Sequence, residues 1–168
     1  MKDTNQLLNT LNGLMMADNY PVTRPVAPEV IPDLMYKAPP TEWPAHKKAV
    51  YADIQRLMSK RQDYAKMFTI MDGAEYNGLT LYNLTQAENG EPIWSNIYVR
   101  NFEARDNDVY VDPNLVDKVL IGEDGMSLFA YSIKEDCFQI HDKASTDYVI
   151  DAYDKFSDFL SELIDTVS

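Results

Sequence analysis

The chain has 168 residues, of which 45% are hydrophobic, enough for a packed core and too many for a wholly disordered protein. Its 15 Lys and Arg face 27 Asp and Glu, so the net charge is −12, which argues against direct nucleic-acid binding because phosphate contacts need basic side chains. The single cysteine, Cys137, excludes an internal disulfide, and with His46 and His141 it is one ligand short of a Cys/His zinc site. We therefore expect no metal and no cofactor.

The chain also lacks the sequence signals of a membrane or secreted protein. No run approaches the roughly 20 apolar residues that cross a bilayer. The first residues, Met1 to Gln6, lack the basic region and apolar run of a signal peptide. We expect a cytoplasmic protein without a membrane partner.

Residues 1–44 are expected to form an N-terminal helix and a Pro-rich irregular segment that packs on, or extends from, a domain of residues 45–168. Leucines at helical spacing follow the candidate caps Asp3 and Thr4. Seven of the nine prolines then lie between Pro21 and Pro44, which excludes a long helix or a central strand there. The segment reads as a strap with apolar anchors at Val26, Val30, Ile31, Leu34 and Met35. The alternative is a P-x-x-P ligand, supplied by Pro25 and Pro28.

Residues 45–71 show an apolar stripe at helical spacing, which predicts one long helix whose remaining faces are mostly basic. Asp72-Gly73 is a turn signal, and the alternation over 79–84 then predicts a strand. A polar loop through Asn89-Gly90 follows. Apolar residues four apart in 93–104 favour a helix.

The rest of the chain alternates short apolar segments with acidic turns. Strands are predicted at 116–122, 127–133, 137–142 and 147–153, and the short links make neighbouring strands antiparallel. A closing helix has an apolar stripe from Phe156 to Val167, with Ser157 or Asp154 placed to cap it. The predicted fold is α+β: an antiparallel β-meander of about five or six strands packed against helices.

The acidic charge is concentrated in the second part of the chain. Residues 1–102 carry 10 basic and 11 acidic side chains, a net of −1, whereas residues 103–168 carry 5 and 16, a net of −11. Such a concentration attracts a basic partner and raises its association rate at low salt. The alternative is that acidic residues simply suit hairpin turns.

Candidate catalytic and metal motifs are incomplete. Asp106, Asp108 and Asp112 suggest calcium, but the sixth and twelfth positions of an EF-hand loop counted from Asp106 are not Gly and Glu. Cys137 and His141 would lie about 13 Å apart on one strand face, too far for a nucleophile and its base. No phosphate loop or hydrolase motif is present, and no pair of carboxylates stands out as an acid/base pair.

One segment carries a family resemblance. Residues 72–82, DGAEYNGLTLY, resemble the xNGxxFNGLxLY stretch of the SUKH superfamily, in particular its YrhA-like branch. The order of IWSNI at 93–97, LIGE at 120–123, FAY at 129–131, FQIHD at 138–142 and FSDFL at 156–160 is similar as well. The resemblance covers roughly residues 45–167 and rests on structural rather than catalytic motifs.

The resemblance implies a bacterial immunity protein, which is not an enzyme and neutralises a cognate toxin, often a nuclease. A nuclease surface is basic because it binds phosphate, so the acidic charge of this chain fits such a partner. The charge pattern, with tyrosines as candidate apolar anchors, predicts a binding surface made by Glu123, Asp124, Glu135, Asp136, Asp142, Asp147, Asp151, Asp154, Tyr131 and Tyr148, with Tyr153 as a further candidate.

Two other functions stay open at this point. A regulatory or scaffolding module of the same fold would act through the Pro-rich segment 19–44. A hydrolase would need a deep pocket with convergent carboxylates.

Overall fold

The computed structural model describes residues 2–85, 87–88, 91–92, 95–106, 108 and 110–168. The helices are α1 (Thr4–Ala17), α2 (Val30–Tyr36), α3 (Ala45–Lys60), α4 (Gln62–Ala65), the 3-10 helix η1 (Lys66–Thr69), α5 (Ile97–Ala104) and α6 (Phe156–Val167). The strands are β1 (Ala74–Tyr76), β2 (Leu79–Leu81), β3 (Ala87–Glu88), β4 (Glu91–Pro92), β5 (Lys118–Glu123), β6 (Ser127–Ser132), β7 (Cys137–Asp142) and β8 (Val149–Tyr153).

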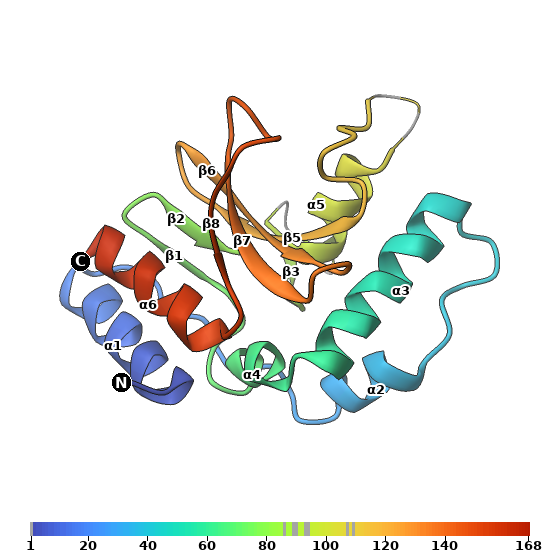
Figure 1. The fold of residues 1–168 in the computed structure, drawn as a ribbon. Coiled ribbons are helices and arrows are strands. Elements are labelled where there is room, and N and C mark those ends of the chain that lie inside the picture. Colours follow the sequence, from blue (N-terminus) through green and yellow to red (C-terminus); the bar gives the residue numbers. More distant parts are fainter. Residues whose placement is uncertain (1, 86, 89–90, 93–94, 107, 109) are drawn as a thin grey trace.

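The centre of the molecule is a six-stranded sheet in the order β1-β2-β5-β6-β7-β8, with every neighbouring pair antiparallel. The predicted α+β class and the meander are therefore confirmed, and β5 to β8 each begin and end within two residues of the predicted bounds. Figure 1 shows α1 and α6 side by side on one side of the sheet and α3 and α5 on the other. Phe159 of α6 stacks on Phe138 of β7, with ring centroids 5.6 Å apart.

The N-terminal helix forms as predicted and packs on α6. The Asp3 carboxylate accepts a hydrogen bond from the Gln6 amide while the Gln6 side chain accepts one from the Asp3 amide, a reciprocal capping box. The Pro-rich segment differs from the predicted irregular strap because it contains α2. Pro32 is tolerated there because it lies in the first turn, where its missing N–H has no helical acceptor. Val26 is buried in the common core and donates its N–H to Phe68 O at 2.8 Å.

The predicted single helix over 45–71 is wrong. The helix stops at Lys60, Arg61 leaves the helical conformation with φ −114° and ψ 78°, and the chain continues as α4 and η1. No Gly or Pro lies between 61 and 71 to announce this break. The contacts of the Arg61 side chain, described below, hold the bend.

The β1–β2 hairpin and the start of α5 both differ from the predicted pattern. Asn77 and Gly78 both have positive φ, 48° and 84°, as a two-residue hairpin turn requires, so the strand at β2 has a partner, β1, that the alternation did not predict. The predicted helix at 93–104 begins at Ile97, after the N-cap Asn96, whose side chain accepts from the amides of Tyr98 and Val99. Ile93 and Trp94 lie outside the described residues.

The cap of α6 comes from a distant part of the chain. Neither Asp154 nor Ser157 caps the helix, contrary to the prediction; the N-cap position is Lys155, which makes no side-chain cap. Instead, the Asp63 carboxylate accepts the Phe156 amide at 3.1 Å. A carboxylate here satisfies one of the free N–H groups and the positive end of the helix dipole.

Candidate functional site

The residues predicted to bind a toxin lie at two opposite ends of the sheet. Each strand of an antiparallel meander reverses direction, so the turns after β5 and β7 share one end, and the turn after β6 and the end of β8 share the other (Figure 1). The first end carries Glu123, Asp124, Asp142, Asp147 and Tyr148, the second carries Glu135, Asp136 and Asp154, and Asp151 lies along β8. Strands of six residues separate the two ends by roughly 17–20 Å.

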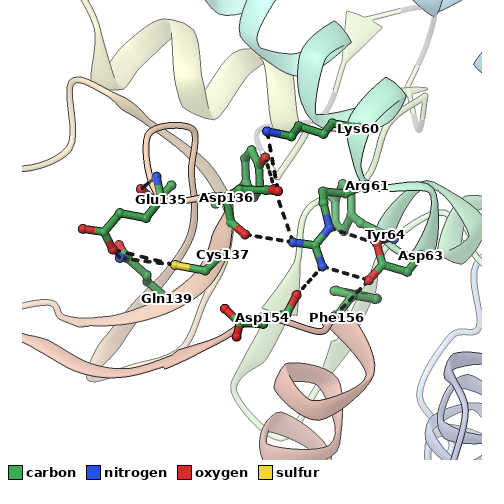
Figure 2. Close-up of polar contacts among 12 residues, drawn as sticks. Lys60, Arg61, Asp63, Tyr64, Glu135, Asp136, Cys137, Gln139, Asp154 and Phe156 are labelled. Carbon is green, nitrogen blue, oxygen red and sulfur yellow. Dashed lines mark hydrogen bonds and ion pairs between the residues drawn. The ribbon is translucent and has the colours of Figure 1, made fainter.

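At the second end, Arg61 binds the acidic turn from inside the protein. Figure 2 shows its guanidinium pointing between α4, the β6–β7 turn and the start of α6. Nη1 donates to the carbonyl and the carboxylate of Asp136 at 3.1 and 3.4 Å, and Nη2 donates to Asp63 Oδ2 at 3.1 Å. Nη2 also donates to Asp154 O, and the guanidinium lies 4.7 Å from the Phe138 ring centroid. Only 12% of the Arg61 side chain is exposed, so this network is structural.

The network lowers the pKa of two carboxyls. The hydrogen bond from the Tyr131 hydroxyl, at 2.6 Å, is the main reason that the pKa of Asp136 is lowered, and the charges of Lys60 and Arg61 add to it against a partial loss of solvation. Burial alone would raise the pKa of Asp63, but hydrogen bonds from Arg61 and the Phe156 amide outweigh it and the pKa is lowered. Asp136 is therefore already paired within the protein.

These shifts predict that stability is lost in acid. Because the folded-state pKa values of Asp63 and Asp136 lie below the ordinary 3.8, the unfolded chain binds more protons as the pH falls. The stabilisation is thus complete above about pH 5 and declines as the pH falls through 3.8 and below. Urea midpoints measured from pH 7 to pH 2.5 should fall less steeply for Asp63→Asn than for the unchanged protein, while the exposed-site control Asp117→Asn keeps the original slope. Equal slopes for all three proteins would contradict the assignment.

Glu123, at the first end, is also paired within the protein. Its carboxylate accepts hydrogen bonds from Tyr82 at 3.0 Å, Arg100 at 2.9 Å and Lys143 at 2.7 Å, and its side chain is only 14% exposed. Partial burial would raise the pKa of Glu123, but the hydrogen bonds from Lys143 and Tyr82 and the charge of Arg100 outweigh it and lower the pKa. This carboxylate holds β5 to α5 and the β7–β8 turn.

The three tyrosines proposed as anchors differ in exposure. Tyr131 is fully buried and donates to Asp136, so it belongs to the core and is removed from the predicted surface. Tyr153 is half-buried, and its ring contacts Phe159 with centroids 6.0 Å apart. Tyr148 is 59% exposed and stays a candidate.

What remains at the first end is an apolar group bordered by carboxylates, which we call the β8 surface. Met126, Tyr148, Val149 and Ile150 are exposed by 80%, 59%, 38% and 48%. A backbone hydrogen bond from Lys143 to Met126 joins the β7–β8 turn to the β5–β6 turn, and one from Asp142 to Tyr148 closes the β7–β8 turn itself. Asp124 and Asp142 line one hollow with Met126 and Ile150, and Asp147 and Asp151 flank residues 148–150 in the sequence. Exposed apolar residues with a polar border mark interaction sites in many proteins.

Sequence reasoning missed Met126, Val149 and Ile150. Val149 and Ile150 lie in the predicted strand 147–153, and only the sheet order shows that β8 is an edge strand, whose first four residues are exposed. The signal that could have found them is the sequence Asp147-Tyr148-Val149-Ile150-Asp151, an apolar triplet between two carboxylates without the alternation of a half-buried strand.

Asp151 blocks the open edge of β8. Its Oδ1 accepts the Ala152 amide at 2.9 Å, and its Oδ2 accepts the Tyr153 hydroxyl at 3.0 Å. The Ala152 N–H therefore points away from β7 and is occupied by a side chain. A register shift between Ile140 and His141 further disturbs the edge. Charged side chains and bulges of this kind prevent unwanted strand pairing.

Removing this carboxylate should promote pairing between copies of the chain. In Asp151→Thr, the Ala152 N–H loses its acceptor and the edge loses a repelling charge, so we expect a larger dimer fraction than in the unchanged protein. Light scattering across a concentration series measures it. Asp117→Thr makes the same charge change outside the strands; if its dimer fraction rises equally, blocking of the edge by Asp151 is wrong.

Cys137 and His141 lie on one strand face, as predicted, with Gln139 between them. The Gln139 side chain contacts His141 Nε2 at 2.9 Å and Cys137 Sγ at 3.7 Å, and His141 Nδ1 lies 2.8 Å from Thr146 O. Burial, followed by the charge of Glu135, raises the pKa of the Cys137 thiol. A thiol held in its neutral form is a poor nucleophile.

A hollow of about 220 Å³ lies beside Tyr20, Thr23 and Asp72. The buried Asp72 carboxylate accepts from the amides of Leu84 and Thr85 and from the Thr85 hydroxyl, so it holds the chain after β2. Within the described part of the chain, no three His, Cys, Asp or Glu side chains gather as metal ligands. None of the described helices is long and apolar enough to cross a membrane.

A comparison with known proteins finds a related sequence. The chain is 34% identical over 84 residues to the uncharacterized protein YrhA of Escherichia coli (strain K12). The chain is similar to YrhA. The match covers 50% of this chain and 59% of YrhA, so the chain spans less than two thirds of its relative. No protein-family model and no solved structure matches. SUKH membership stays a prediction.

Proposed function

We propose that this protein is a non-enzymatic, immunity-type protein of the bacterial cytoplasm that binds and neutralises a basic, nuclease-like toxin. The observation that carries the proposal is the β8 surface: four exposed apolar side chains bordered by four carboxylates, in a chain of net charge −12. The resemblance to the SUKH superfamily supplies the class of partner.

In such an interface, the apolar side chains and the carboxylates contribute in different ways. The apolar centre loses water on binding and supplies affinity, because hot spots are buried aromatic and apolar side chains. The carboxylate border attracts a cationic partner and speeds association, an effect that weakens as salt screens the charges. A nuclease surface that grips phosphate offers the matching positive charge.

The test uses the products of toxin genes next to the gene for this protein. We expect one basic toxin domain to bind in a pull-down, with affinity falling as salt rises from about 50 to about 300 mM. Tyr148→Ala combined with Asp147→Lys should weaken binding at least about 30-fold, which corresponds to about 2 kcal/mol. Asp117→Lys, at the other end of β5, is the matched control and should bind nearly normally. Binding that ignores both salt and the double variant would overturn the proposal.

The Pro-rich segment offers a second candidate function, as a ligand for a scaffolding partner, because Pro25 and Pro28 are both exposed. Deleting residues 19–44 would not test it, since Val26 fills the core and Arg24 O accepts the Asp72 amide. Pro25→Ala with Pro28→Ala is the sharper variant. Loss of a partner with this variant, and not with the Tyr148 variant, would favour the scaffolding function.

A further inference from the structure

A groove of about 410 Å³ lies at one side of the β8 surface. Five parts of the chain line it: the β1–β2 turn at Gly78, the β5–β6 turn, the end of β7 at Asp142, β8 at Ile150, and the last turn of α6 at Val167. Met126 and Ile150 give it exposed apolar walls. Its size is at the lower end for sites that take a small molecule or one large side chain.

Two carboxylates of the groove are held in place by their own turns. Asp124 Oδ1 accepts the amides of Met126 and Ser127 at 2.8 and 2.7 Å, and Asp142 Oδ1 accepts the Ala144 amide at 2.9 Å. Ser127 pairs directly with Asp142 across β6 and β7, so the two carboxylates flank one position of the sheet. Among the described residues, the second oxygen of each has no hydrogen-bond donor.

The charges around the groove favour a cation. Lys143, the nearest basic residue in these turns, directs its ammonium to Glu123 at 2.7 Å and to the carbonyl of Asp124 at 2.8 Å, not to the two groove carboxylates. The C-terminal turn of α6 adds the negative end of a 12-residue helix. Asn77 Nδ2 donates to Val167 O at 3.0 Å and fixes this turn against the β1–β2 hairpin.

We propose that the groove binds an arginine side chain of the basic partner. The argument is charge complementarity joined to shape: an arginine places its apolar stem along Met126 and Ile150 and its planar, weakly hydrated head between Asp124 and Asp142. Arginine is favoured over lysine because its forked donors can reach two carboxylates at once. A second copy of this acidic chain is a poor occupant because its net charge would repel. The inference rests on the proposed function for the partner, and the site itself can be tested without that partner.

The probe is N-acetyl-arginine N-methylamide, with the neutral citrulline analogue as its isosteric control. We expect the arginine probe to shift the amide NMR signals of Gly78, Gly125 and Ile150 in a saturable way, and citrulline to shift them at least about tenfold more weakly. Asp124→Asn with Asp142→Asn keeps the Oδ1 acceptors of both turns and should abolish the response. Asp117→Asn should leave it unchanged.

A second variant tests the same site independently, in case the Asp124→Asn, Asp142→Asn variant fails to fold. Met126→Lys, at a side chain that is 80% exposed, places a cation in the groove and should also prevent the arginine response. The inference would be overturned if citrulline shifted the groove signals as strongly as the arginine probe. It would also be overturned if the arginine probe shifted signals around Asp117 as strongly as those of the groove, or if both variants kept the full response. If the toxin binds the Asp124→Asn, Asp142→Asn variant normally, the groove is not an arginine site of the interface, and the proposed function is unaffected. If the arginine probe binds specifically but no toxin binds, the groove is an arginine site and the proposed function is wrong.

Discussion

Replacing Arg61 with methionine should destabilise the protein by about 3 kcal/mol, one of the largest effects of any single substitution outside the apolar core. The substitution removes the hydrogen bonds to Asp63, Asp136 and Asp154 O and leaves two carboxylates close together without their shared cation. Because Asp63 and Asp136 are 36% and 39% exposed, water offsets part of the loss, and we place the effect at the low end for a broken buried ion pair.

The matched control is Lys60→Met, the residue before it. Lys60 also pairs with Asp136, at 3.5 Å, but its side chain is 53% exposed, so its removal should cost less than about 1 kcal/mol. Arg61→Lys should recover only part of the loss, because an ammonium cannot reproduce the forked contacts. Chemical denaturation measures all three. Similar costs for Arg61→Met and Lys60→Met would show that the bend after α3 does not depend on the guanidinium.

Gly73→Ala should lower the free energy of unfolding of the protein by about 2–5 kcal/mol. Gly73 has φ +75°, and a Cβ there would lie 2.6 Å from Leu81 O and 2.9 Å from Asn83 N. Both obstacles are backbone atoms, so no side chain can move aside. The same denaturation series measures the cost.

Gly13→Ala is the opposite case and the matched control. Gly13 is exposed inside α1, and nothing lies within 4 Å of its would-be Cβ. Alanine should therefore stabilise the protein by about 0.5–1 kcal/mol, through better helix propensity and a more restricted unfolded chain. Equal effects of the two substitutions would contradict this account of Gly73.

The acidic residues of the second part of the chain fall into two groups: some stabilise the fold, and others are candidates for binding a partner. Glu123 and Asp136 stabilise the fold, and substituting them would confuse a binding measurement with a loss of stability. Asp124, Asp142 and Asp147 lie on the surface beside Met126 and Tyr148. Binding experiments should use this second group.

The sequence by itself determined the features that depend on neighbours along the chain. Helical spacing predicted α1 and α6, and short apolar segments between acidic turns predicted the strands from β5 to β8, because both signals lie within a few neighbouring residues. The Asp3 cap was readable for the same reason. The net charge of −11 over residues 103–168 needed only counting.

Tertiary structure decided whatever depends on residues far apart in the chain. Asp63 caps α6 across 93 positions, and Arg61 ends α3 by reaching the β6–β7 turn, contacts that no local pattern encodes. Successive turns of a meander lie at opposite ends of its sheet, so acids that are close in sequence separate into two groups. Sheet order made β8 an edge strand and exposed Ile150, while the same pairing geometry buried Tyr131.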